Sequence, residues 1–221
     1  MRTIPGYIPI ICLLISMMPG RLYAQKLSFE GGVTFGVYGV DFKGEEERLW
    51  GDDFEKSGIL GISAGPFVRC YFTADFYGVI ELRYTQKGST FGFINQNFTQ
   101  SFETIRLDYT EIPFLVGSKN QVIFSSGNKA DLYIESGFVF SKLVSSRLKD
   151  HEETRRVNTP SVSGFKNYDF SWVIQLKSPY RIKRNEQIQL GLRMEHSIIT
   201  IHTRYKLYNF DYGLELNYLF N

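Results

Sequence analysis

The sequence predicts an all-β protein, an eight-stranded antiparallel up-and-down transmembrane β-barrel with a side-chain-filled polar interior. Three observations support this prediction. Apolar and polar residues alternate in eight segments, long connections alternate with shorter ones, and the 221 residues include 19 Phe and 14 Tyr. Aromatic residues favour β-strands and membrane interfaces. The mean hydropathy of the chain is slightly negative, as expected for membrane strands that have one polar face.

The N-terminal segment has the features of a secretory signal peptide. Arg2 precedes the apolar run Ile8–Met18, and the small residue Ala24 follows shortly afterwards. A charged start, an apolar centre and a small-residue exit are typical of cleaved signals, and the apolar run is too short to span a membrane. We therefore expect residues 1–24 to be a signal peptide and residues 25–221 to form one barrel domain.

The mature chain is electrically balanced. The full sequence has 25 Lys and Arg residues and 23 Asp and Glu residues. Arg2 and Arg21 would leave with the signal peptide, so no excess of positive charge favours a nucleic-acid partner. Cys12 would leave as well. Cys70 then remains as the only cysteine, which excludes an intramolecular disulfide.

The segment Tyr208–Asn221 shows the strand pattern most clearly. Its even-numbered residues are all apolar or aromatic, and its odd-numbered residues, apart from Leu219, are polar or glycine. Successive side chains of a strand point to opposite faces, so one face is apolar and the other polar. The segment exceeds the roughly 9–11 residues of a tilted membrane strand. An aromatic-rich final strand, here with Phe220 next to last, is typical of outer-membrane barrels.

Seven further segments show similar alternation. The predicted strands are Leu27–Val40, Ile59–Phe72, Phe76–Gly88, Thr104–Gly117, Ala130–Val144, Tyr168–Lys177 and Glu186–Ile198.

Two of these segments contain irregularities. Pro66 cannot donate a backbone hydrogen bond, so it predicts a local bulge in the second strand. In the fourth strand the apolar positions change from odd to even numbers, because Ile105, Leu107 and Tyr109 are followed by an apolar set that begins at Ile112. This change of phase predicts a β-bulge near residues 110–111.

The connections differ in length. The predicted loops after the first, third, fifth and seventh strands are Asp41–Ser57, Ser89–Glu103, Ser145–Asn167 and Thr200–Lys206, and the other connections are Thr73–Asp75, Ser118–Lys129 and Ser178–Asn185. The first set is mostly long and polar. Outer-membrane barrels have long external loops and short periplasmic turns, so this asymmetry predicts the cell outer membrane as the location.

Residue size indicates which face points outward. Alternation alone does not distinguish a membrane barrel from a soluble ligand-binding barrel. The strand glycines lie mostly on the polar face, for example Gly32, Gly36 and Gly191. An eight-stranded barrel has a narrow interior, so the polar face with its small residues belongs inside. The aromatic-rich face then contacts outer-membrane lipid.

The predicted interior is rich in charge. Its acidic residues are Glu30, Glu81, Asp108, Glu111, Glu135, Asp169, Glu195, Asp211 and Glu215, and its basic residues are Arg69, Arg83, Lys87, Arg106, Lys177 and Arg193. Buried charges require partners of opposite sign. Eight strands enclose little free space, so we expect a structural ion-pair core rather than a transport pathway.

The sequence offers little support for catalysis. A small lipid-modifying outer-membrane enzyme is an alternative, and Glu195-His196-Ser197 is the stretch that suggests it. Adjacent residues of a strand point in opposite directions, so His196 and Ser197 would not act together. We expect His196 at the outer lipid interface. The sequence has no metal-ligand spacing, and we expect no catalytic, cofactor-binding or metal-binding residues.

Three segments resemble the PorT-type family of outer-membrane β-barrel proteins. They are E-L-R-Y-T-Q-K-G at Glu81–Gly88, L-D-Y-T-E-I-P-F-L-V-G at Leu107–Gly117 and Y-I-E-S-G-F at Tyr133–Phe138. The Y-x-E-I-P element is the most specific of these. PorT is associated with the type IX secretion system, so the resemblance implies a non-enzymatic structural or accessory role in an envelope or secretion assembly. It supplies no catalytic residues.

A second hypothesis is a stand-alone surface barrel whose extracellular loops bind ligands or host surfaces. The loops favour neither hypothesis, because 45–53 is acidic and 149–156 has mixed charge. The sequence names no protein partner and leaves the oligomeric state open. Proteins that co-purify with the detergent-extracted chain would distinguish the two hypotheses.

Overall fold

The computed structural model describes residues 27–45, 54–94, 100–123, 129–150, 164–183 and 186–220. The predicted signal peptide, residues 1–24, lies outside these ranges. In the described part of the chain, no helix has the length and apolar character that a membrane span requires.

The described residues form nine strands in one sheet. The strands are β1 (Ser28–Gly44), β2 (Phe54–Tyr71), β3 (Phe76–Glu81), β4 (Arg83–Ile94), β5 (Gln100–Ile123), β6 (Lys129–Asp150), β7 (Tyr168–Lys183), β8 (Glu186–Ser197) and β9 (Leu207–Phe220). Every pairing between neighbours is antiparallel.

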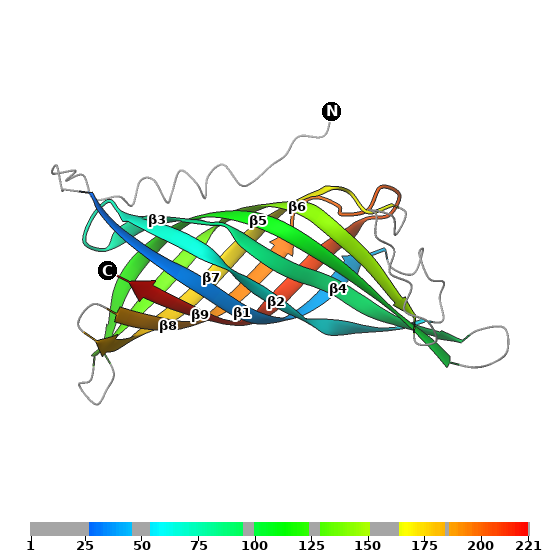
Figure 1. Cartoon of the computed structure of the whole chain (residues 1–221), viewed down its shortest axis with the longest axis horizontal. Helices are drawn as coiled ribbons and strands as arrows, with labels where there is room; N and C mark the ends of the chain where they lie inside the picture. Colours follow the sequence, from blue (N-terminus) through cyan, green and yellow to red (C-terminus); the bar gives the residue numbers. More distant parts are fainter. Residues whose placement is uncertain are drawn as a thin grey trace.

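The sheet closes on itself as a ring (Figure 1). β1 pairs with β2 on one side and with β9 on the other, so the first and last strands are neighbours. From β5 to β9 each strand pairs with the next strand in the sequence. This is the predicted all-β, antiparallel, up-and-down arrangement. A closed ring satisfies backbone hydrogen bonds that an open sheet edge would leave exposed.

The structure has nine strands where the sequence predicts eight, because the predicted strand Phe76–Gly88 is divided at Leu82 into β3 and β4. The Leu82 N–H donates to the Pro66 carbonyl oxygen at 3.0 Å. Pro66 has no N–H with which to return the second bond of the pair. The register of β2 continues unbroken past Pro66, from Ala64 opposite Tyr84 to Phe67 opposite Glu81, so the bulge predicted at Pro66 is wrong. The register shift of β2 lies between Gly58 and Ser63.

The bulge predicted near residues 110–111 is wrong. Ile105, Leu107 and Tyr109 are buried inside the ring, and Glu111 continues the same inward phase. The register shift lies instead in β6, where Val144 is the extra residue opposite the junction of Asp108 and Tyr109. The sequence pattern was misleading because the interior is apolar near this end, so an apolar side chain there does not indicate contact with lipid.

Several strands are longer than predicted. β5 covers Gln100–Ile123 and β6 covers Lys129–Asp150. Parts of the predicted loops Ser89–Glu103 and Ser145–Asn167 are therefore strand. Alternation weakens in these parts because they lie beyond the apolar outer band, where the outward face is polar.

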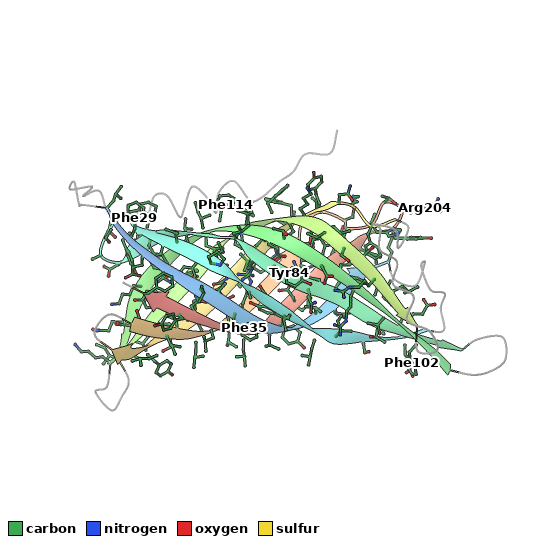
Figure 2. The ribbon with its side chains drawn as sticks, viewed as in Figure 1. Phe29, Phe35, Tyr84, Phe102, Phe114 and Arg204 are labelled. Carbon is green, nitrogen blue, oxygen red and sulfur yellow. The ribbon has the colours of Figure 1, made fainter. Side chains whose placement is uncertain are left out.

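The outer surface has the predicted apolar character. Phe35, Phe114 and Leu192 have exposed fractions of 49%, 53% and 59%, respectively. Side chains extend outward around the ring, with Phe29 near one end and Phe102 near the other (Figure 2). Small residues make room inside, since a Cβ atom at Gly36 would overlap the phenol ring of Tyr38. The structure thus confirms the predicted choice of outward face for these strands.

The two ends of the ring differ. One end holds the starts of β1 and β3 and the ends of β2 and β9, and we call it the turn end. The opposite end holds the β8–β9 connection, residues 198–206, and the far ends of β4, β5 and β6 (Figure 1). We call it the loop end.

Leu192→Arg should destabilise the folded protein in bilayers. Leu192 lies in the middle of β8 with its side chain on the outer face, so arginine there would cost roughly 2–4 kcal/mol near the bilayer midplane. Ile182→Arg is the matched control, because Ile182 is also exposed but lies near the turn end of β7. The control should cost about 0–1 kcal/mol. Urea unfolding in lipid vesicles measures both, and equal losses would contradict the proposed membrane position.

Candidate functional site

The interior of the ring holds a dense set of charged side chains. In the described part of the chain, the buried inward acidic residues are Glu81, Glu111, Glu135, Asp169, Glu195, Asp211 and Glu215, and the buried inward basic residues are Arg69, Arg83, Lys87, Lys177 and Arg193. We call this set the interior charge network. None of these residues has more than 3% of its surface exposed.

Arg83 of β4 lies at the centre of the network. Its Nε atom lies 3.2 Å from a Glu111 carboxylate oxygen of β5. Its Nη1 atom lies 3.2 Å from oxygens of both Glu81 and Glu215, which belong to β3 and β9. Its Nη2 atom lies 3.8 Å from Glu195 of β8. The planar guanidinium therefore connects carboxylates from opposite sides of the ring, using the fork of donors that distinguishes arginine from lysine.

Lys87 extends the network toward the loop end. Its Nζ atom lies 2.6 Å from Glu195, 2.9 Å from Glu111 and 3.5 Å from Asp211. Lys87 and Arg83 thus share two carboxylates. Removing either cation would leave both carboxylates with fewer partners in a site without water access.

Lys177 and Arg69 extend the network toward the turn end. Lys177 Nζ lies 2.8 Å from Glu135 and 3.1 Å from Glu215. Arg69 Nη2 lies 3.1 Å from Glu135. The Arg69 guanidinium also lies 4.6 Å from the centroid of the Tyr77 ring, a distance suited to a cation–π interaction. Glu135 therefore receives two cations from two different strands.

Tyrosine hydroxyls complete the network. Tyr38 OH donates to Glu215 at 3.0 Å, and Tyr77 OH donates to Glu135 at 3.1 Å. Sequence reasoning missed Tyr38 and Tyr77 as interior polar partners, because a tyrosine on a barrel strand also suits the lipid interface. Their positions in the alternation could have identified them, because each lies on the same inward face of its strand as glycine or valine.

Apolar clusters close the interior at both ends. The loop-end cluster consists of Phe42, Phe91, Ile105, Leu107, Tyr109, Leu143, Ile201 and Leu207. The turn-end cluster consists of Phe67, Tyr77, Val79, Leu115, Tyr133, Val139, Val173 and Leu219. Ile201 comes from the connection 198–206 and is fully buried, so this connection folds into the loop end. The loop-end cluster thus covers the charge network at one end, and at the other end the turn-end cluster packs around Arg69, which contacts the partly exposed Glu30.

Two predicted members of the network lie elsewhere. Arg106 is exposed and lies between the inward residues Ile105 and Leu107, so it points outward. Asp108 lies between Leu107 and Tyr109 and forms an ion pair with Arg147 of β6 on the outer face. The interior assignment of Arg106 and Asp108 is therefore wrong. The bulge predicted at residues 110–111 produced this error, because it reversed the phase of the strand before that point.

The other predicted interior residues all line the inside of the ring. Glu81, Arg83, Lys87, Glu111, Glu135, Arg193, Glu195, Asp211 and Glu215 belong to the network, and Arg69, Asp169 and Lys177 do so as well. Glu30 lies at the turn end, where its side chain is 24% exposed and 3.5 Å from Arg69.

The geometry offers no catalytic pair at His196 and Ser197. The Ser197 hydroxyl points inward and donates to Asp169 at 2.7 Å. The His196 ring lies on the other face, with centroid distances of 6.0 Å to Tyr208 and 5.9 Å to Phe210. Within the described ranges, no group of three or more His, Cys, Asp or Glu side chains is placed to hold a metal ion.

Comparison with known proteins identifies the family. Residues 23–218 match the family model described as the outer membrane protein beta-barrel domain. The chain belongs to this family. The protein is therefore an outer-membrane β-barrel protein, as the alternation, the apolar outer face and the ring closure predict. No curated protein matches the sequence.

Solved structures of outer-membrane proteins are similar to this barrel at low sequence identity. Neisserial surface protein A (NspA) is 9% identical, with 87% of this chain and 98% of that chain covered and a TM-score of 0.45. Ail, the attachment invasion locus protein of Yersinia pestis, is 12% identical, with 86% and 98% covered and a TM-score of 0.39. OprG from Pseudomonas aeruginosa is 8% identical, with 88% and 95% covered and a TM-score of 0.43.

Arg83→Met should destabilise the barrel strongly. The substitution removes a cation that contacts four carboxylates, and unpairing buried charges costs roughly 3–5 kcal/mol. Arg106→Met is the control, because Arg106 is exposed on the outer face. Its effect on the free energy of unfolding in neutral micelles should be within about 0.5 kcal/mol. Similar losses for the two variants would argue against the interior network as the stabilising core.

Proposed function

We propose that this outer-membrane barrel is non-enzymatic and non-conducting, and that it acts by binding a partner at its loop end. We count β3 and β4 as one position in the ring because both lie between β2 and β5. The ring then corresponds to an eight-stranded barrel. Such a barrel has an interior that side chains fill.

The observation that supports this proposal most strongly is the closed interior. The charges of Arg83, Lys87 and Lys177 are all paired with carboxylates, and apolar clusters cover the network at both ends. An ion pathway would require space and water along the barrel axis. In the described part of the barrel the network side chains are at most 3% exposed, so we assign the function to the surfaces outside the bilayer.

The loop end offers the larger of these surfaces. β4, β5 and β6 continue beyond the apolar outer band, and we call residues 90–94, 100–104 and 148–150 the strand extension. Short turns of outer-membrane barrels face the periplasm and long connections face outward, which places the strand extension outside the cell. Among the described strands, β6 pairs only with β5 over residues 148–150 of the strand extension. A strand edge can bind an extended peptide by adding a strand.

An accessory role in a secretion assembly is the second candidate. One structural observation favours it. At the turn end, β5 and β6 pair beyond the last β6–β7 partners, and Val122 and Ile123 at the end of β5 have exposed fractions of 37% and 64%. Apolar side chains there suit contact with a periplasmic protein.

The PorT resemblance itself does not decide between the two candidates. Its most specific element, Y-x-E-I-P, covers Tyr109–Pro113, and Glu111 contacts Arg83, Thr85 and Lys87 inside the barrel. The element therefore serves the interior network that supports the fold. A barrel of either function requires it.

Purified protein in planar bilayers should show no stable single-channel steps. The interior charges are paired and both ends are closed by apolar clusters, so ions have no hydrated route. Heat-modifiable gel migration of the same sample verifies that the barrel is folded. Reproducible conductance steps from folded protein would overturn the non-conducting proposal.

Exchange of one connection at each end should identify which surface binds the partner. In the sequence, residues 151–163 follow β6, which ends in the strand extension, and residues 124–128 follow β5, which ends at the turn end. Each is replaced by a Gly-Ser segment of equal length, and proteins crosslinked to the barrel in intact cells are compared by mass spectrometry. Loss of the crosslinked partner only on exchange of 151–163 is the expected result. Loss only on exchange of 124–128 would favour the accessory role instead.

A further inference from the structure

Two arginines lie directly opposite each other on the outer face of the barrel. Arg106 of β5 and Arg147 of β6 are partners in the register of these strands. Opposite residues of antiparallel strands have Cβ atoms roughly 4.5–5.5 Å apart, and like charges in such pairs are destabilising. A third cation, Lys142 of β6, is exposed on the same face, opposite Thr110. We call Arg106, Lys142 and Arg147 the basic patch.

The protein supplies only part of the negative charge that the basic patch requires. Arg147 donates to Asp108, which lies diagonally across from it. Among the described residues, Arg106 forms no ion pair and Lys142 forms none, so one carboxylate serves three cations. This imbalance contrasts with the interior, where every cation contacts a carboxylate.

The basic patch lies at the boundary of the apolar outer band. Below it on the same two strands are Phe114 and Phe140, with exposed fractions of 53% and 45%. The ring of Tyr168 stacks on Phe140 at a centroid distance of 5.6 Å and is half exposed. Aromatic residues flank the apolar band of membrane barrels at the interfaces. The patch is therefore at the level of the lipid headgroups of the outer leaflet.

A groove leads from the patch into the apolar band. Its volume is about 500 Å³, and its lining is Thr110, Ile112, Phe140, Lys142, Leu143 and Val144. The bulge at Val144 lies within this groove. The lining is mainly apolar, and Lys142 contributes the charge. An acyl chain fits such a groove, and a lipid phosphate at its upper end would lie near the basic patch.

We propose that the basic patch and this groove bind a phosphate-bearing anionic lipid of the outer leaflet. The phosphate lies between Arg106 and Arg147 and offsets their repulsion, because arginine forms paired charge-assisted hydrogen bonds with phosphate oxygens. Lys142 adds a point charge, and one acyl chain follows the groove past Ile112. This site is distinct from the loop-end surface proposed to bind a partner, and its occupancy does not depend on that proposal.

Lipid binding to the folded full-length mature barrel in neutral detergent tests the inference. Native mass spectrometry follows titrations with phosphatidic acid, with diacylglycerol of the same chains, and with inorganic phosphate. The double variant Arg106→Gln/Arg147→Gln should bind phosphatidic acid about tenfold or more weakly. The control Lys43→Gln/Arg204→Gln removes the same charge from exposed residues at the same end. It should bind phosphatidic acid as the unaltered protein does.

The groove is tested separately by Val144→Trp, which fills it. The Val144→Trp variant should bind long-chain phosphatidic acid more weakly than the unaltered protein does. The unaltered protein should bind diacylglycerol and inorganic phosphate far more weakly than it binds phosphatidic acid. Heat-modifiable migration confirms that each variant folds. Equal weakening by the control double variant would show general charge attraction and overturn the site. Binding of inorganic phosphate as strong as that of the lipid would also overturn it, because the site would then serve free phosphate.

Discussion

The contact of the Arg83 guanidinium with carboxylates from four strands is the interaction on which the rest of the structure depends. Glu81, Glu111, Glu195 and Glu215 come from β3, β5, β8 and β9. Each carboxylate is buried, so its charge is tolerated only while the cation is in place. Strand pairing supplies the ring, whereas the contacts with Glu195 and Glu215 connect β4 to β8 and β9, which do not pair with it. They also fix which residues of each strand face inward, since a one-residue slip in strand register would turn the charged side chains toward lipid.

The network also limits what the barrel can do. Each interior cation contacts at least one carboxylate, and none of these charged side chains is more than 3% exposed. A transport path would require charges that exchange partners with a moving ion. On the outer face, by contrast, Arg106 lies directly opposite Arg147, and among the described strands β6 pairs only with β5 over residues 148–150. The proposed activities are accordingly those of surfaces.

Much of this structure was predictable from the alternation of the sequence. The outward face, the antiparallel order and most interior charges follow from side-chain period and residue size, and Arg83 and Glu111 are examples. Prediction failed where the surroundings changed along a single strand. Leu107 and Tyr109 are apolar yet point inward, because the loop-end interior is itself apolar. Because the prediction assigned Leu107 and Tyr109 to the outer face, it assigned the alternating residues Arg106 and Asp108 to the interior. The break at Leu82 depends on a missing hydrogen-bond donor at Pro66 in a neighbouring strand. The alternation of residues along a single strand contains no information about such a partner.

Reactivity of an interior cysteine tests the sealed interior most directly. Ser141 is fully buried and contacts Glu111, so Ser141→Cys in a Cys70→Ser background places one small thiol inside the network. Thr203→Cys in the same background provides an exposed control at the loop end. A membrane-impermeant maleimide should label Cys at position 203 readily in the folded barrel. It should label position 141 only after unfolding. Labelling of both positions at similar rates in the folded barrel would contradict a closed, charge-paired interior.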